Sequence, residues 1–264
     1  MLNQKIIVSG CSNLAGTKLS LKSENYKELN VAAKLKEKLN YEVFDLAIEG
    51  SDNRSIISRT VDLINTGVYP DYVIIQFTYP ERFRTPKLRS APKPGFHIHH
   101  PQNINMKADN LKAHGLTKSD YRFLKQYYDF AKSDLMPQLE LTLDIQLMEG
   151  YLKSKDIPYS FIVWPYMTKS ATNRNAFRDI DTSRIINYDD YTLYDMYTVL
   201  RSYEFITSSE PSPDDPRVLD GHFMEDALDF MANSIIDHMI NGTKLVAQGD
   251  YKDKPFNDRF LHIY

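Results

Sequence analysis

The sequence predicts an α/β protein built on a parallel sheet of at least four strands. Short apolar runs that are typical of buried strands alternate with longer stretches of helical periodicity. The expected strands are residues 6–8, 41–48, 72–77 and 158–164. Strands that are separated by helices run parallel and are joined by right-handed crossovers. Their carboxyl ends therefore meet at one edge of the sheet, where proteins of this class bind ligands.

The helices are expected where apolar residues recur at intervals of three and four. Ser51 or Asp52 can cap the helix that begins at Asn53, and Gly242 marks the end of the last helix. A proline disfavours helical geometry in the residue before it, so we expect a break near Pro137. The expected helices are residues 24–40, 53–65, 119–155 with this break, 189–203 and 223–240.

Composition excludes several classes of protein. A net charge of −3 on 264 residues gives no basic surface for nucleic acid. The sequence has no apolar run long enough to span a membrane, and we expect no signal peptide. The single cysteine, Cys11, cannot form an internal disulfide and favours a reducing compartment. We therefore expect a cytoplasmic protein with one domain over residues 1–242, followed by a C-terminal extension, 243–264, that binds a neighbouring copy in a homo-oligomer.

Residues 84–118 are rich in proline and follow the third strand, so we expect a flap over the edge of the sheet. The flap contains a histidine cluster, His97, His99 and His100. Imidazoles bind zinc or nickel, but a structural zinc site has four ligands and no cysteine or nearby carboxylate completes the set. We expect neither a metal nor a cofactor, and the histidines are either exposed or in contact with the substrate.

Gly10-Cys11-Ser12 directly follows the first strand and makes Ser12 the candidate nucleophile. A serine nucleophile needs an imidazole that takes its proton, a carboxylate that orients the imidazole, and donors for the oxyanion. The simpler interpretation is a turn in which the glycine gives backbone freedom. A third interpretation, phosphate binding by residues 10–16, lacks the lysine of a nucleotide-binding loop.

Asp220-Gly221-His222 precedes the last helix and supplies the other two groups. The simpler interpretation is that Asp220 caps that helix and His222 is an ordinary residue of its first turn. A parallel sheet brings Ser12, Gly50, Thr78 and His222 to the same edge, although they are far apart in the sequence.

The order of these motifs, with Gly50 and Asn53 after the second strand, resembles the SGNH (GDSL-like) hydrolase superfamily, especially its divergent members in bacteriophage genomes. The resemblance implies a three-layer α/β/α sandwich with a central parallel sheet (flavodoxin-like) and a shallow esterase site. It implies that Ser12 is the nucleophile, His222 the base and Asp220 its orienting acid, with the amides of Ser12 and Gly50 as oxyanion donors. The implied substrate is a small-molecule or glycan ester, such as an acetylated glycan, and a viral chain would work in the host cytoplasm or on the virion.

The sequence departs from the family pattern at two motifs. Cys11 stands where the family has Asp, and Thr78-Tyr79-Pro80-Glu81 stands where the family has an oxyanion-hole Asn. Loss of one such donor costs roughly a hundredfold in rate. The candidate replacements are Asn53, Tyr79 and Arg82. The Asp–His spacing is also one residue shorter than usual, which leaves Asp214 and Asp215 as alternative orienting acids.

Two functions remain open at this point. The first is a serine ester hydrolase, which the joint presence of Ser12, Asp220 and His222 favours. The second is a catalytically weak or inactive binding or virion-associated structural protein with the same fold, which Pro80 at the expected Asn position favours.

Overall fold

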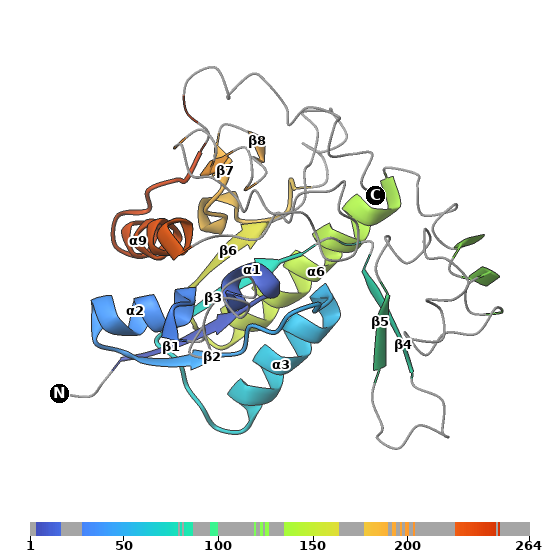
Figure 1. Ribbon diagram of the computed structural model, residues 1–264, viewed down its shortest axis with the longest axis horizontal. Helices are drawn as coiled ribbons and strands as arrows, with labels where there is room; N and C mark the ends of the chain where they lie inside the picture. The colour runs from blue at the N-terminus through green and yellow to red at the C-terminus, as the bar shows by residue number, and fades with distance from the viewer. Residues whose placement is uncertain are drawn as a thin grey trace.

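The computed structural model describes residues 4–16, 28–78, 80, 82–86, 96–99, 119, 122–123, 125–126, 135–163, 177–189, 192–193, 196, 199–200, 203, 225–246 and 248. A central parallel sheet with helices on both faces forms this part of the chain (Figure 1). The predicted three-layer α/β/α architecture is confirmed.

The four strands of the sheet are the four that the apolar runs predict. Their spatial order is β2-β1-β3-β6, and every neighbouring pair is parallel. In the register, Val8 lies beside Asp45 on one side and Ile74 on the other. The strands are β1 (Lys5–Ser9), β2 (Glu42–Asp45), β3 (Tyr72–Phe77) and β6 (Tyr159–Val163).

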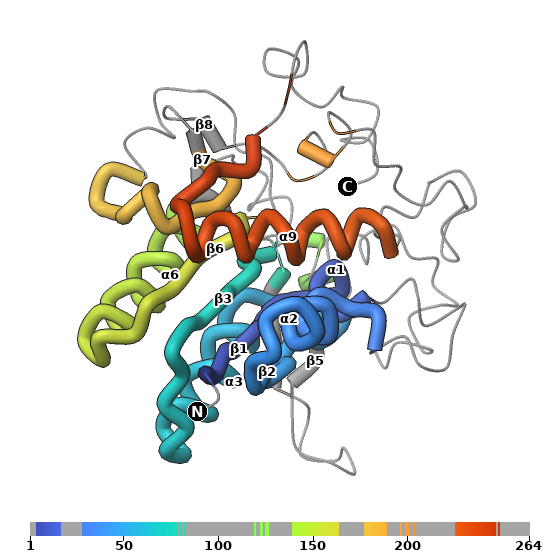
Figure 2. The backbone as a smooth tube through the Cα atoms, turned by 90° about the vertical axis from the view of Figure 1, so that its left-hand side faces the viewer, coloured from blue at the N-terminus to red at the C-terminus, as the bar shows by residue number. Residues whose placement is uncertain are grey.

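In the described part of the chain, two helices cover each face of the sheet. α2 and α9 pack on one face and on each other, and α3 and α6 pack on the opposite face (Figure 2). The helices are α1 (Ser12–Ala15), α2 (Val31–Leu39), α3 (Asn53–Asn65), α6 (Leu135–Ser154) and α9 (Glu225–Asn241). Within the described residues, no helix combines the length and apolar character needed to cross a bilayer.

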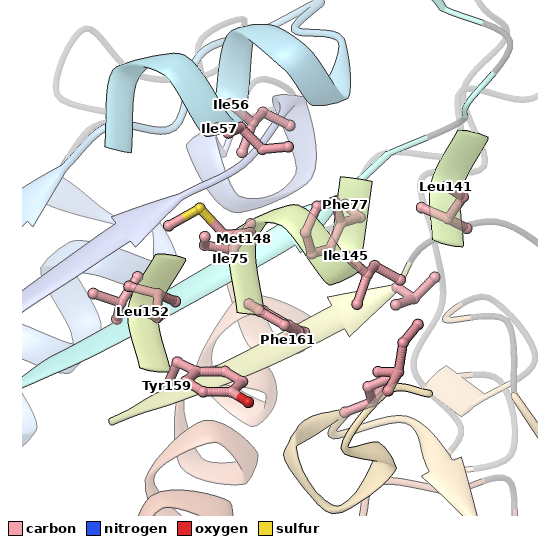
Figure 3. Packing of buried hydrophobic residues seen from close by; sticks show 14 of the residues in the cluster. Ile56, Ile57, Ile75, Phe77, Leu141, Ile145, Met148, Leu152, Tyr159 and Phe161 are labelled. Carbon is pink, nitrogen blue, oxygen red and sulfur yellow. The ribbon is translucent and has the colours of Figure 1, made fainter. Parts of the chain in front are cut away.

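Alternation along the strands divides the core in two. Ile6 and Val8 of β1 point to the layer of α2 and α9, whereas Ile7 points to the layer of α3 and α6. Figure 3 shows the second layer, in which Met148 of α6 lies over Ile75 of β3. Burial of each such side chain contributes about 1.5–3 kcal/mol.

Capping residues explain where the helices begin and end. The Asp52 side chain accepts a hydrogen bond from the Ser55 amide at 2.9 Å, so α3 begins at the predicted residue. Asn30 caps α2 in the same way through the Ala33 amide. α2 therefore begins later than predicted, and residues 24–27 lie outside the described part. Gly242, with φ of 70°, follows the last residue of α9 as predicted.

Two predictions of local structure were wrong. Residues 83–86 and 96–99 form an antiparallel hairpin of β4 (Phe83–Pro86) and β5 (Phe96–His99), where the sequence predicted no regular structure. The start of the predicted helix 189–203 instead forms the antiparallel pair β7 (Tyr188–Asp189) and β8 (Thr192–Leu193), and helical geometry occurs only at described residues 196, 199 and 200. Aromatic and β-branched residues favour strands, and this preference outweighed the helical spacing.

The start of the C-terminal extension packs against the chain's own short 3-10 helix η4 (Thr182–Arg184). The Lys244 ammonium donates to the carbonyls of Thr182, Ser183 and Ile185, each at 2.7 Å. The Leu245 amide donates to the Ile186 carbonyl at 2.9 Å. Most of the extension lies outside the described residues, so its binding to a neighbouring copy stays a prediction.

Candidate active site

The strand order places a switch point between β1 and β3. The chain leaves β1 towards β2 on one side and returns on the other side at β3. Ligands of open α/β sheets bind at the carboxyl ends of strands at such a point. Here the residues that follow β1 and β3 include Cys11 and Thr78, and the short helix α1 begins at once with Ser12.

Ser12 is the first residue of α1. Gly16 ends this helix in the left-handed region, with φ of 69°, and its amide donates to the Ser12 carbonyl. The first amides of a helix have no acceptor within it, so the Ser12 N–H is suited to bind an oxyanion. The Ser12 hydroxyl lies 4.0 Å from the Cys11 sulfur, and only 5% of the residue is exposed.

Gln76 of β3 supports the turn before Ser12. Its Oε1 accepts from the Cys11 amide at 3.3 Å and lies 3.6 Å from the Cys11 Sγ. A Cβ on Gly10 would lie 2.9 Å from the same oxygen and 2.9 Å from the Leu14 Cδ1, so close packing requires glycine there. Gln76 is not among the predicted site residues, although a polar residue in an apolar strand was the signal.

The loop after β2 joins the turn that carries Ser12. The Ile48 amide donates to the Gly10 carbonyl at 3.2 Å, and the Ser51 hydroxyl donates to the Ile48 carbonyl at 2.8 Å. Gly50 turns this loop with a φ of 72°, a conformation that side chains other than glycine rarely adopt.

Asn53 connects this second loop to the end of β3. Its Oδ1 accepts from the Thr78 amide at 2.7 Å, and its Nδ2 donates to the Thr78 carbonyl at 3.2 Å. Asn53 therefore holds the backbone at Thr78. A role for Asn53 as an oxyanion donor stays a prediction.

Two arginines connect the loops further. Arg59 of α3 donates to the Leu46 carbonyl at 3.2 Å, to the Ser51 hydroxyl at 2.9 Å and to the Gly10 carbonyl at 3.4 Å. Burial lowers the pKa of Arg59, and the negative charge of Asp52 opposes this shift. Arg82 donates to the Ser51 carbonyl at 3.2 Å, which places a second guanidinium at this edge. Arg59 was not predicted, because the apolar stripe of α3 gives no sign of it.

Three buried polar atoms at this edge have no hydrogen-bond partner in the described part of the chain. They are Asn13 Oδ1, Gln76 Nε2 and Thr78 Oγ1. Such an atom costs about 1–3 kcal/mol. They cluster at the carboxyl ends of β1 and β3, and buried polar atoms without partners are often found at functional sites.

The beginning of α9 lies at the same edge as Ser12. The Lys34 Nζ of α2 lies 3.5 Å from the Glu225 Oε1, and the Lys38 Nζ lies 3.0 Å from the Asp229 Oδ1. Because both partners are four residues further along their helices in the second pair, the two helices run parallel. α2 begins on the carboxyl side of β1 and leads to the start of β2. The first residue of α9 is therefore near the edge that carries α1, as Figure 2 shows.

The structure brings five predicted site residues together and leaves others undescribed. Ser12, Gly50, Asn53, Thr78 and Arg82 lie in or directly beside three connected loops at one edge of the sheet. The predicted residues that lie outside the described part are Tyr79, Asp214, Asp215, Asp220 and His222. His97 and His99 belong to β5, and His100 lies outside the described part. No group of three potential metal ligands occurs among the described residues.

No family model and no curated protein matches this sequence. Several solved structures resemble its fold. A protein described as lipolytic and of the G-D-S-L family, from Desulfitobacterium hafniense, is 14% identical over 88% of this chain and 98% of its own, with a TM-score of 0.46. The esterase EstA from Pseudoalteromonas is 10% identical over 90% and 97%, with a TM-score of 0.44. An acetyl xylan esterase is 14% identical over 88% and 98%, with a TM-score of 0.42. At these values the similarity assigns no activity to this chain.

Proposed function

We propose that this chain is a serine ester hydrolase of the SGNH type with Ser12 as its nucleophile. The observation that carries the proposal is the place of Ser12, which begins a helix at the switch point between β1 and β3. Bonds from Gln76, Arg59 and the loop after β2 hold the turn before it. A nucleophile in a fixed position beside backbone amide donors is what acyl transfer needs.

In the proposed reaction, the Ser12 hydroxyl attacks the acyl carbon and His222 takes its proton. Asp220 orients the imidazole, with Asp214 and Asp215 as alternatives, and the amides of Ser12 and Gly50 stabilise the oxyanion. His222 returns the proton to the leaving alcohol, and water then releases the acid from Ser12. Asn53, Arg82 and Tyr79 are the candidates for the third oxyanion donor.

The position of α9 supports the role of His222. His222 is three positions before Glu225 in the sequence, a span of about 10 Å at most. Glu225 lies beside Lys34 of α2, near the edge that carries Ser12. The start of α9 on this side of the sheet is what supports a base at position 222 in the proposal.

The test is covalent labelling of the purified full chain. A fluorophosphonate should modify Ser12, as located by peptide mass spectrometry, and the protein should hydrolyse p-nitrophenyl acetate. Ser12→Ala should lose both properties while it retains the circular dichroism of the wild type. Ser154→Ala, at an exposed position on α6, is the matched control and should retain both.

The competing function is a binding protein without catalysis. Pro80 is buried shortly after Thr78, in the motif where the family has an Asn, and gives no side-chain donor. A wild-type protein that takes no label and hydrolyses no ester would favour this function. An acylated glycan stays a prediction for the substrate, to be tested with acetylated oligosaccharides.

A further inference from the structure

Gln76 is a polar side chain in the middle of the apolar strand β3. Its neighbours Ile75 and Phe77 are fully buried, and Gln76 itself has 0% exposure. The strand lies between β1 and β6, so its side chains are enclosed by the helix layers. An amide at such a position loses its contacts with water and has to find partners within the protein.

The oxygen of the Gln76 amide has a defined use. It accepts from the Cys11 N–H at 3.3 Å, which belongs to the peptide unit immediately before that of Ser12. It also lies against Gly10, where a Cβ would approach it to 2.9 Å. The amide thus contacts two successive residues of the turn that presents the nucleophile.

The nitrogen of the same amide has no acceptor in the described part of the chain. A buried donor without an acceptor lowers stability. A side chain that only filled this space would be better served by methionine, which has a similar shape and no polar hydrogen. The gain that offsets this cost therefore lies in the contact of the oxygen with the turn.

We propose that Gln76 is the positioning residue of Ser12. By holding the Cys11 amide, it fixes the peptide that precedes the nucleophile and aims the Ser12 hydroxyl and amide at the reacting carbonyl. Gln76 is fully buried and acts through this turn, so its role is that of a positioning residue and not of a catalytic one. The inference rests on the proposed function and adds a residue to it.

The experiment compares Gln76→Met with Gln76→Glu in the full chain. Gln76→Met removes the acceptor and keeps the volume, whereas Gln76→Glu keeps an oxygen acceptor at the same place. The matched control is Ser160→Ala in β6, which removes another fully buried polar group of the sheet, one bonded to the Tyr72 hydroxyl at 2.6 Å. The measurements are the rate constant for fluorophosphonate labelling of Ser12, kcat and KM for p-nitrophenyl acetate, and hydrogen exchange at the Cys11 amide.

We expect Gln76→Met to label at least tenfold more slowly than the wild type, with a lower kcat, an unchanged KM and faster exchange at Cys11. Its melting temperature should stay close to that of the wild type, because the unpaired Gln76 nitrogen is gone while the buried Cys11 amide loses its acceptor. Gln76→Glu should recover most of the labelling rate. Ser160→Ala should label at the wild-type rate even where its stability is lower.

Wild-type labelling by Gln76→Met overturns the role of Gln76 and leaves the proposed function intact. If Gln76→Met does not fold, Gln76→Glu decides, since a folded Glu variant that labels as slowly as Ser12→Ala also overturns the role. Absence of label in the wild type overturns the proposed function itself. The two failures are therefore distinguishable.

Discussion

Asn53 binds both backbone groups of Thr78, its Oδ1 accepting from the amide at 2.7 Å and its Nδ2 donating to the carbonyl at 3.2 Å. One side chain thus joins the first turn of α3 to the end of β3. The two bonds mimic a strand neighbour at a point where the sheet has ended. Because Asn53 is buried, water cannot replace it.

Asn53→Ala should therefore destabilise the protein. Two buried backbone groups lose their partner, and we expect a loss of about 1–3 kcal/mol in the free energy of unfolding. Urea denaturation followed by circular dichroism measures this loss. Asn233→Ala, at an exposed position on α9, should change stability by less than about 0.5 kcal/mol. Equal stabilities of the two variants would show that the bonds from Asn53 to Thr78 do not stabilise the protein.

Two glycine-to-alanine substitutions should change the free energy of unfolding in opposite directions. A Cβ on Gly10 would lie 2.9 Å from both Gln76 and Leu14, and such overpacking costs about 1–3 kcal/mol. A Cβ on Gly150, within α6, meets nothing within 4 Å, and alanine there should stabilise the helix by about 0.5–1 kcal/mol. Thermal melts of both variants test this pair, and a stabilising Gly10→Ala would contradict the packing described for the turn.

The stability of the protein should depend on pH through the carboxyl group of Asp144. Burial raises the pKa of this carboxyl to about 6, and the nearby Arg54, at 2.6 Å, only partly opposes the shift. The folded state then binds more protons than the unfolded state between about pH 4 and pH 6, so this group contributes stability at low pH that is lost as the pH rises. The loss amounts to up to about 3 kcal/mol.

Asp144→Asn should remove this contribution. The stability of the wild type relative to the variant should fall as the pH rises from about 4 to about 7, as measured by urea denaturation at each pH. Asp62→Asn, at an exposed position on α3, reports the effect of removing one surface charge. A difference in stability between the wild type and Asp144→Asn that is flat across this range would refute the buried, protonated carboxyl.

Lys244→Met should loosen the start of the C-terminal extension. The ammonium donates to three carbonyls around the end of η4, and methionine keeps only the apolar stem. Net of solvation, a hydrogen bond from a charged donor contributes about 1.5–3 kcal/mol, and because the bond to Ser183 is exposed we expect a total loss near the lower value. Limited proteolysis should cut the variant sooner after residue 241. The exposed Lys155→Met serves as control.

His222→Ala should abolish most of the esterase activity that we propose. Because a nucleophile and its base act as a unit, the double variant with Ser12→Ala should be little worse than either single variant. Initial rates with p-nitrophenyl acetate measure this. Additive losses would mean that the two residues act separately.

The parallel sheet and its helices could be predicted because their signals are local. The apolar run that ends at Phe77 predicted both ends of β3 correctly, and the Asp52 cap predicted the first residue of α3. The hairpin of β4 and β5 was missed because each strand has only four residues, too few for a period to emerge. The β7–β8 pair was missed because helical spacing occurs by chance in a segment rich in aromatic residues.

The site was predictable in part for the same reason. Ser12 and Gly50 follow predicted strands, so the topology alone brings them to one edge. Gln76 holds Cys11 and Arg59 holds Gly10 through contacts between residues 65 and 49 positions apart, which no local pattern contains. The sequence predicted Asn53 as a candidate oxyanion donor. The structure shows that its side chain bonds to the backbone of Thr78.

The parallel pairing of α2 with α9 also sets an order of events during synthesis. Lys34 and Lys38 leave the ribosome about 190 residues before their partners Glu225 and Asp229, and a chain is made at roughly 5–20 residues per second. The part of this face that α9 covers therefore stays open for some ten seconds or more. On the proposed chemistry, the nascent chain carries its nucleophile throughout that interval without its base, so the enzyme cannot act on any ester before its last helix has docked.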